Sequence, residues 1–172
     1  MGDNTIIKNK AEFEANAQTF LDKIFNPVLK NNLGDIEIRT FPKGQWPEQY
    51  FCQTVKEAVE IAFDLCNSGV DVYFGVNPRT GKAGRKENVH YVEAFHAEID
   101  YGSDGHEKPS DYENYDEAIK AITNFKPQPT LINHSGGGLH CYWALRTPVK
   151  KDEIGVKELE SINKYFLKLL GG

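Results

Sequence analysis

The sequence predicts an α+β fold in one domain, made of helices and strands that alternate along 172 residues. Two patterns predict it: apolar residues recur at helical spacing in some segments, and apolar and polar residues alternate in others. The second half of the chain also has the order strand-helix-strand-strand-helix. The length agrees with one domain, since domains average roughly 150 residues.

The first half is expected to form an N-terminal α/β module over residues 1–88. Residues 11–25 place apolar side chains every three or four positions, which predicts an amphipathic helix. Residues 36–41 alternate as a half-buried strand. Trp46 and Tyr50 are expected in the core, with base stacking as the alternative. The remaining elements of this half are a helix over 54–65 and a strand over 70–76.

The second half, residues 89–172, is expected to form a βαββα unit. Its strands are predicted at 89–101, 130–134 and 139–146, and its helices at 115–125 and 151–170. This is the order of a split βαβ unit, as in RNA-recognition-like folds. Such a unit has a fourth strand after its last helix. The chain stops at Gly172 instead, so we expect a fragment truncated before that strand.

Composition and charge narrow the function classes. The formal net charge of −5 disfavours a protein that binds nucleic acid through its overall charge. A local basic patch is still expected in the loop between residues 77 and 90, at Arg79, Lys82, Arg85 and Lys86. Three cysteines without a C-x-x-C pair disfavour a disulfide framework. No run is apolar enough to span a membrane, and we expect a cytoplasmic protein.

A strand with two carboxylates is the first candidate site. In residues 95–101, alternation directs His96, Glu98 and Asp100 to one face and the apolar residues to the other. The two carboxylates would lie roughly 7 Å apart between Cβ atoms and would repel each other unless neutralised. Mg²⁺ or Mn²⁺ would neutralise them, since hard cations prefer carboxylate oxygens. A solvated polar strand face is the alternative interpretation.

A glycine-rich turn is the second candidate site. Ser135 is followed by three glycines, Gly136, Gly137 and Gly138, and His140 comes two residues later. The glycines leave backbone N–H groups unshielded and free to bind an anion. His140 is expected on the sheet face that carries Glu98 and Asp100. A flexible hairpin tip and a hydrogen-bonded surface histidine are the alternatives.

Together, the segments 73–102 and 132–145 resemble the archaeo-eukaryotic primase superfamily. The resemblance is greatest to the primase-polymerase and RepB-like primase domains of phages, plasmids and other mobile elements. It rests on the acidic pair, here E-I-D, and on the run S-G-G-G-L-H. It implies a catalytic core in which an N-terminal α/β module packs on an RNA-recognition-like palm.

The resemblance also implies roles for the matching residues. Glu98 and Asp100 would bind Mg²⁺ or Mn²⁺, and His140 would complete the catalytic set. Ser135, Gly136, Gly137, Gly138 and His140 would hold the nucleotide triphosphate, and the basic loop would contact DNA. The sequence departs from the family pattern in two ways: Glu98 stands where the family usually has Asp, and no third carboxylate is found.

The function that these roles imply is a DNA primase-polymerase, a nucleotidyltransferase acting on a single-stranded DNA template or primer. It would use NTP or dNTP, and further C-terminal domains such as a helicase would follow. The first alternative is a catalytically incomplete module that binds nucleic acid or nucleotide. The second is a metal-dependent hydrolase with His96, Glu98, Asp100 and His140 as ligands.

Overall fold

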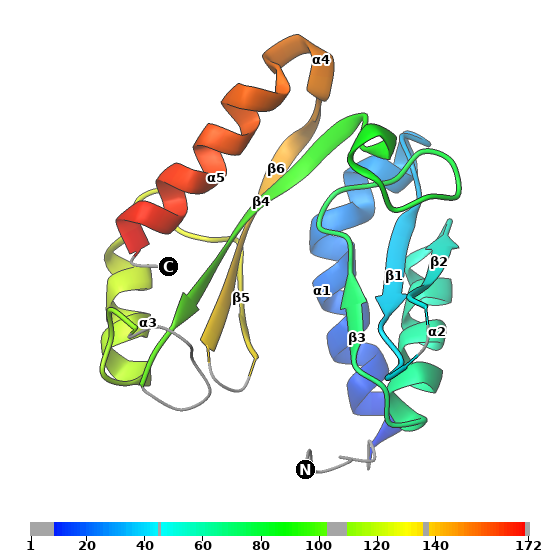
Figure 1. The fold of residues 1–172 in the computed structure, drawn as a ribbon, viewed down its shortest axis with the longest axis horizontal. Coiled ribbons are helices and arrows are strands. Elements are labelled where there is room, and N and C mark those ends of the chain that lie inside the picture. Colours follow the sequence, from blue (N-terminus) through cyan, green and yellow to red (C-terminus); the bar gives the residue numbers. More distant parts are fainter. Residues whose placement is uncertain (1–8, 45, 103–109, 136–137, 171–172) are drawn as a thin grey trace. The chain divides into compact units, whose positions relative to one another are not determined.

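The computed structural model describes residues 9–44, 46–102, 110–135 and 138–170. In this part of the chain the fold is mixed α+β, with five α-helices and two small antiparallel sheets of three strands each (Figure 1). The chain forms two compact units. Unit 1 contains residues 1–93 and 146–150, and unit 2 contains residues 94–145 and 151–172. Each unit is described by itself below.

Unit 1 is a sheet with strand order β2-β1-β3 and two helices. Its elements are α1 (Lys10–Lys30), β1 (Ile36–Thr40), β2 (Glu48–Cys52), α2 (Val55–Asn67) and β3 (Val72–Phe74). Side chains cap both helices at the start: Asn9 accepts from the Glu12 backbone N–H, and Thr54 accepts from the Glu57 backbone N–H.

One face of the unit 1 sheet packs on α1. Ile38 is buried and lies opposite Phe74 in the strand register. The Phe74 ring makes edge contacts with Phe20 and Phe25 of α1, with centroids 5.4 Å and 6.3 Å away. Because side chains alternate along a strand, Glu37 and Arg39 lie on the other face of this sheet. The burial of Glu37 on that second face was not expected from the sequence.

Unit 2 is a sheet with strand order β4-β6-β5, so the last strand lies between the other two. Its elements include β4 (Tyr91–Asp100), α3 (Tyr115–Asn124), β5 (Leu131–His134), β6 (Gly138–Lys150), α4 (Lys151–Ile154) and α5 (Val156–Leu170). The first residues of β4 and the last of β6 belong to unit 1.

An aromatic cluster forms the core of unit 2. The ring of Trp143 on β6 lies 4.5 Å from the ring of Phe166 on α5, measured between centroids. Phe125 and Phe95 make edge contacts with Phe166. The Trp143 indole N–H donates to the Pro127 carbonyl at 2.8 Å, so this buried polar group is satisfied.

The structure differs from the sequence prediction at several elements. Strand β2 was not anticipated, and α1 continues past Pro27 to Lys30. The final predicted helix is divided at Gly155, whose φ of +94° is left-handed. The expectation that Trp46 lies in the core was wrong, because its side chain is 90% exposed.

No helix in the described ranges is both long enough and apolar enough to cross a membrane. None of the three cysteines forms a disulfide.

Candidate functional site

Strand β4 presents the two predicted carboxylates on one face. Ala97 and Ile99 are buried, at 1% and 0% exposure, whereas Glu98 and Asp100 are exposed. This alternation is the one that the sequence predicts. The strand therefore directs both carboxylates away from the apolar core, to a face where they can meet a ligand.

The glycine turn lies against this carboxylate pair. A Cβ added to Gly138 would stand 2.8 Å from Oδ1 of Asp100 and 3.0 Å from the Ile99 carbonyl oxygen. A side chain at position 138 would therefore displace the Asp100 carboxylate or the strand backbone. The structure thus brings together the end of the predicted phosphate-binding turn and the predicted metal-binding strand.

Ser135 closes the same turn. Its backbone N–H and its hydroxyl both donate to the Gly138 carbonyl, each at 3.0 Å. Gly136 and Gly137, which were also predicted to bind phosphate, lie outside the described residues. The hydroxyl of Ser135 is thus committed as a donor within the turn, and its oxygen remains able to accept.

Two histidines share this face with Glu98. Burial lowers the pKa of His96, the nearby charge of Glu98 raises it, and His140 lowers it further. Nδ1 of His96 is buried without a hydrogen-bond partner among the described residues. The charges of Glu98 and His140 thus both act on the pKa of His96, and a common site for the three residues stays a prediction.

Tyr142 is a neighbour of the site that the sequence analysis did not identify. It lies two residues after His140 on β6 and is 4% exposed. Burial, followed by the charge of Glu98, raises its pKa to about 12. The phenol therefore stays protonated at neutral pH and can donate a hydrogen bond beside Glu98. Its position at i+2 from His140 was the available signal.

An aromatic group also lies at the end of β4. The rings of Tyr101, Tyr115 and His134 are 5.9–6.1 Å apart between centroids, and the Tyr101 hydroxyl hydrogen-bonds to Nε2 of His134. This contact fixes the end of β5 immediately before Ser135, and so it helps to hold the start of the glycine turn.

The part of the chain that the structure describes has no group of three or more His, Cys, Asp or Glu side chains arranged to hold a metal ion. Of the residues predicted to bind a metal, Glu98 and Asp100 are both exposed carboxylates on β4. Two carboxylates suit Mg²⁺, which usually keeps several waters and binds protein through one or two carboxylates together with substrate phosphates.

The predicted basic loop belongs to unit 1 and contains two kinds of cation. The side chains of Lys82, Arg85 and Lys86 are exposed. Nη1 of Arg85 lies 3.9 Å from Oε1 of Glu87. Arg79 is different: its side chain is 15% exposed, and its Nε donates to Oε2 of Glu37 at 2.7 Å.

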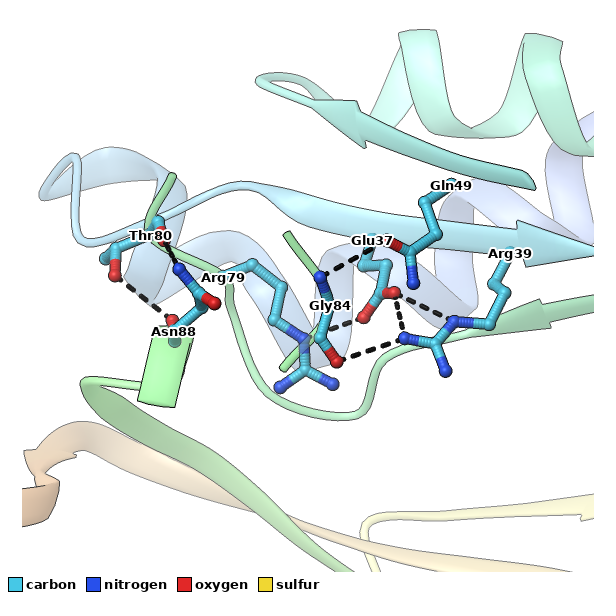
Figure 2. Close-up of polar contacts among 7 residues, drawn as sticks. All are labelled: Glu37, Arg39, Gln49, Arg79, Thr80, Gly84 and Asn88. Atoms are coloured by element: carbon cyan, nitrogen blue, oxygen red, sulfur yellow. Dashed lines mark hydrogen bonds and ion pairs between the residues drawn. The ribbon is translucent and has the colours of Figure 1, made fainter. Parts of the chain in front are cut away.

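Glu37 is the centre of a polar cluster that the sequence did not predict (Figure 2). Its side chain is 1% exposed and is bound by Arg39 and Arg79. Nη2 of Arg39 also donates to the Gly84 carbonyl at 3.1 Å. The cluster thereby ties the loop to β1, across more than 40 residues of sequence.

The Gly84 backbone fits closely within this cluster. A Cβ at Gly84 would stand 2.1 Å from both Nη2 of Arg39 and Oε1 of Glu37. Nearer the start of the loop, Thr80 and Asn88 exchange backbone and side-chain hydrogen bonds of 2.8–3.1 Å. The exposed cations of the loop are therefore carried on a backbone that is fixed at both ends.

No family model, curated protein or solved structure matched this chain in the comparisons made.

Proposed function

We propose that this chain is the core of a DNA primase-polymerase, which transfers nucleotidyl groups on a single-stranded DNA template with Mg²⁺ or Mn²⁺. The observation that carries the proposal is the close approach of the Gly138 backbone to Asp100, where an added Cβ would stand 2.8 Å from Oδ1. The strand order β4-β6-β5 supports it, because a split βαβ unit inserts its third strand between the first two.

In this proposal the carboxylates of Glu98 and Asp100 would hold the metal, which when bound would neutralise charge at the phosphates and activate the attacking hydroxyl. His140 and the glycine turn bind the triphosphate, the histidine as a donor and the turn through backbone N–H groups. Ser135 holds the turn closed through its bonds to the Gly138 carbonyl. Tyr142 donates beside Glu98.

The template strand is proposed to follow the basic loop. Lys82, Arg85 and Lys86 are exposed and would contact phosphates without reading sequence. Arg79 contributes through its terminal nitrogens, since its Nε is committed to Glu37. NTP or dNTP is the proposed substrate, and further domains such as a helicase are the proposed partners within one polypeptide.

A catalytically incomplete binding module is the second candidate function. Two observations favour it: Glu98 replaces the usual Asp, and the described residues offer two grouped carboxylates instead of three. The extra methylene of glutamate moves the oxygens, and Mg²⁺ tolerates little deviation from octahedral geometry. No observation on the described residues favours the hydrolase alternative, which would use His96, Glu98, Asp100 and His140 as metal ligands.

The test is incorporation of labelled nucleotide on a single-stranded DNA template with Mn²⁺. The wild-type chain, Asp100→Asn and the matched control Asp64→Asn are compared, since Asp64 is an exposed aspartate on α2 in unit 1. We expect incorporation by the wild type and the control, and a loss of at least about 100-fold in Asp100→Asn.

Folded wild-type protein that binds Mn²⁺ and DNA but incorporates no nucleotide would overturn the catalytic proposal in favour of the binding module. Equal incorporation by Asp100→Asn and the wild type would overturn the assignment of Asp100 as a metal ligand.

A further inference from the structure

The second face of the unit 1 sheet, on which the loop residues Arg79 and Gly84 also lie, combines two cations with two exposed aromatic rings. The cations are Arg39 and Arg79, here called the arginine pair. The rings are Phe41 and Tyr73, here called the aromatic pair, each 51% exposed. The sequence analysis placed none of these residues except Arg79 in a binding site.

The arginine pair carries more positive charge than its structural partner neutralises. One buried carboxylate, that of Glu37, faces two guanidiniums, so the cluster has a formal charge of +1. A purely structural ion pair would need a single guanidinium. Excess positive charge in a partly buried site is unfavourable unless an anion accompanies it.

The arginine pair also has donors to spare. Glu37 receives Nε and Nη2 of Arg39 and Nε of Arg79, and Nη2 of Arg39 also reaches Gly84. Among the described residues, nothing accepts from Nη1 of Arg39 or from Nη1 and Nη2 of Arg79. Figure 2 shows the two guanidiniums approaching Glu37 from opposite sides. Such fixed donors match the oxygens of a phosphate.

The aromatic pair adjoins the arginine pair on the same face. Tyr73 lies directly opposite Arg39 in the strand register. The Phe41 ring is 5.9 Å from Cζ of Arg39, and it contacts the Tyr73 ring edge-on at 5.4 Å between centroids. Exposed rings beside fixed cations are the combination by which proteins bind single-stranded nucleic acid, with bases stacked on rings and phosphates on cations.

We propose that this sheet face binds a nucleotide unit of a single-stranded nucleic acid, with the phosphate on the arginine pair and the base on the aromatic pair. Glu37 is a positioning residue that holds both guanidiniums. The site lies wholly within unit 1 and involves neither the carboxylates nor the glycine turn of unit 2. It therefore does not depend on catalysis by the chain.

The first experiment measures binding of labelled oligothymidylate, about 15 nucleotides long, by fluorescence anisotropy at low salt. The Phe41→Ala/Tyr73→Ala variant is compared with Tyr165→Ala, which removes another exposed ring, 59% exposed on α5. We expect roughly 10-fold weaker binding in the first variant and unchanged binding in the control, because stacking on one base contributes about 1–3 kcal/mol.

The second experiment measures the same affinity as a function of salt concentration. In Arg39→Gln, Arg79 still neutralises Glu37, so we expect the variant to remain folded, which thermal unfolding verifies. The slope of log K against log salt should become shallower by about 0.7, the value for one phosphate contact with a single strand. Arg146→Gln, at an exposed arginine, should keep the wild-type slope.

Competition by dTMP identifies the source of the nucleotide unit. Weak competition by dTMP with strong competition by the oligonucleotide assigns the site to a polynucleotide, and equal competition assigns it to a free nucleotide.

Two outcomes would overturn the inference. One is absence of oligothymidylate binding by the wild type. The other is wild-type affinity in the aromatic-pair variant together with the wild-type salt slope in Arg39→Gln. Asp64→Asn, at an exposed aspartate outside both sites, should bind as the wild type does. The binding assay requires no nucleotide incorporation, so failure of the catalytic proposal would be seen separately.

Discussion

Gly138 and Asp100 are packed so closely that a methyl group at position 138 would stand 2.8 Å from the aspartate carboxylate. The absence of a side chain on β6 therefore allows the carboxylate on β4 to occupy its position. This relationship makes Gly138 a direct target for testing the packing of the two strands.

We predict that Gly138→Ala lowers nucleotide incorporation at least 10-fold while the chain stays folded. The added Cβ must displace Asp100 or the Ile99 carbonyl, and such overpacking usually destabilises a protein by about 1–3 kcal/mol. Incorporation assays and urea denaturation measure the two effects. Unchanged incorporation together with unchanged stability would contradict this packing.

The carboxylate strand shows how much of the site the sequence could predict. One buried and one exposed face impose a period of two, so the alternation in β4 correctly predicted that Glu98 and Asp100 are exposed while Ala97 and Ile99 are buried. The turn beside them could be inferred because β5 and β6 are joined by only a few residues. Tyr142 was missed because its burial depends on packing that the local pattern does not contain.

Unit 1 shows what the sequence could not predict. The alternation Ile36, Glu37, Ile38 and Arg39 indicates a solvated polar face, yet Glu37 is buried. Its burial results from a loop more than 40 residues away, which brings Arg79 and Gly84 to the strand. Similarly, the basic residues of that loop looked equivalent in sequence, although Arg79 is held by the buried carboxylate of Glu37 and the side chains of Lys82, Arg85 and Lys86 are exposed. Long-range contacts of this kind leave no periodic signal.

Removal of the Glu37 carboxylate should destabilise unit 1 severely. Glu37→Ala leaves two guanidiniums without their buried counter-charge, a change that typically costs about 3–5 kcal/mol. Glu60→Ala makes the same substitution at an exposed glutamate on α2 and should change stability by less than about 0.5 kcal/mol. Urea denaturation of both variants measures the difference, and equal stabilities would refute a structural role for Glu37.

Glu93 should make the chain less stable as the pH rises. Its side chain is fully buried, neither oxygen has a hydrogen-bond partner among the described residues, and burial raises its pKa from 4.5 to about 8. Between these values the folded chain holds a proton that the unfolded chain releases. The free energy of unfolding should therefore fall by about 1.4 kcal/mol per pH unit across that window.

Thermal unfolding of Glu93→Gln at pH 5 and pH 8 checks this prediction. The variant cannot ionise at this position, so it should lose less stability than the wild type between the two pH values. Parallel changes in the wild type and the variant would show that Glu93 does not carry the pH dependence.

The three cysteines should react in a defined order. Cys52 and Cys141 are buried, and burial raises the pKa of each thiol to about 12. Cys66 is partly exposed, although burial raises its pKa as well. Because the thiolate is the reactive form, iodoacetamide at pH 8 should label Cys66 first and the other two only after denaturation. Peptide mass mapping reads the order, and early labelling of Cys141 would contradict the packing of β6.

The two tryptophans belong to different units and differ in exposure to solvent. Trp46 in unit 1 is 90% exposed, whereas Trp143 in the core of unit 2 is 5% exposed. Intrinsic fluorescence can therefore distinguish the units without any label. An aqueous quencher should remove the red-shifted emission of Trp46 and leave the blue-shifted emission of Trp143. The remaining signal would then report unfolding of unit 2 alone, and the quenched fraction would respond to ligands that cover the neighbourhood of Trp46.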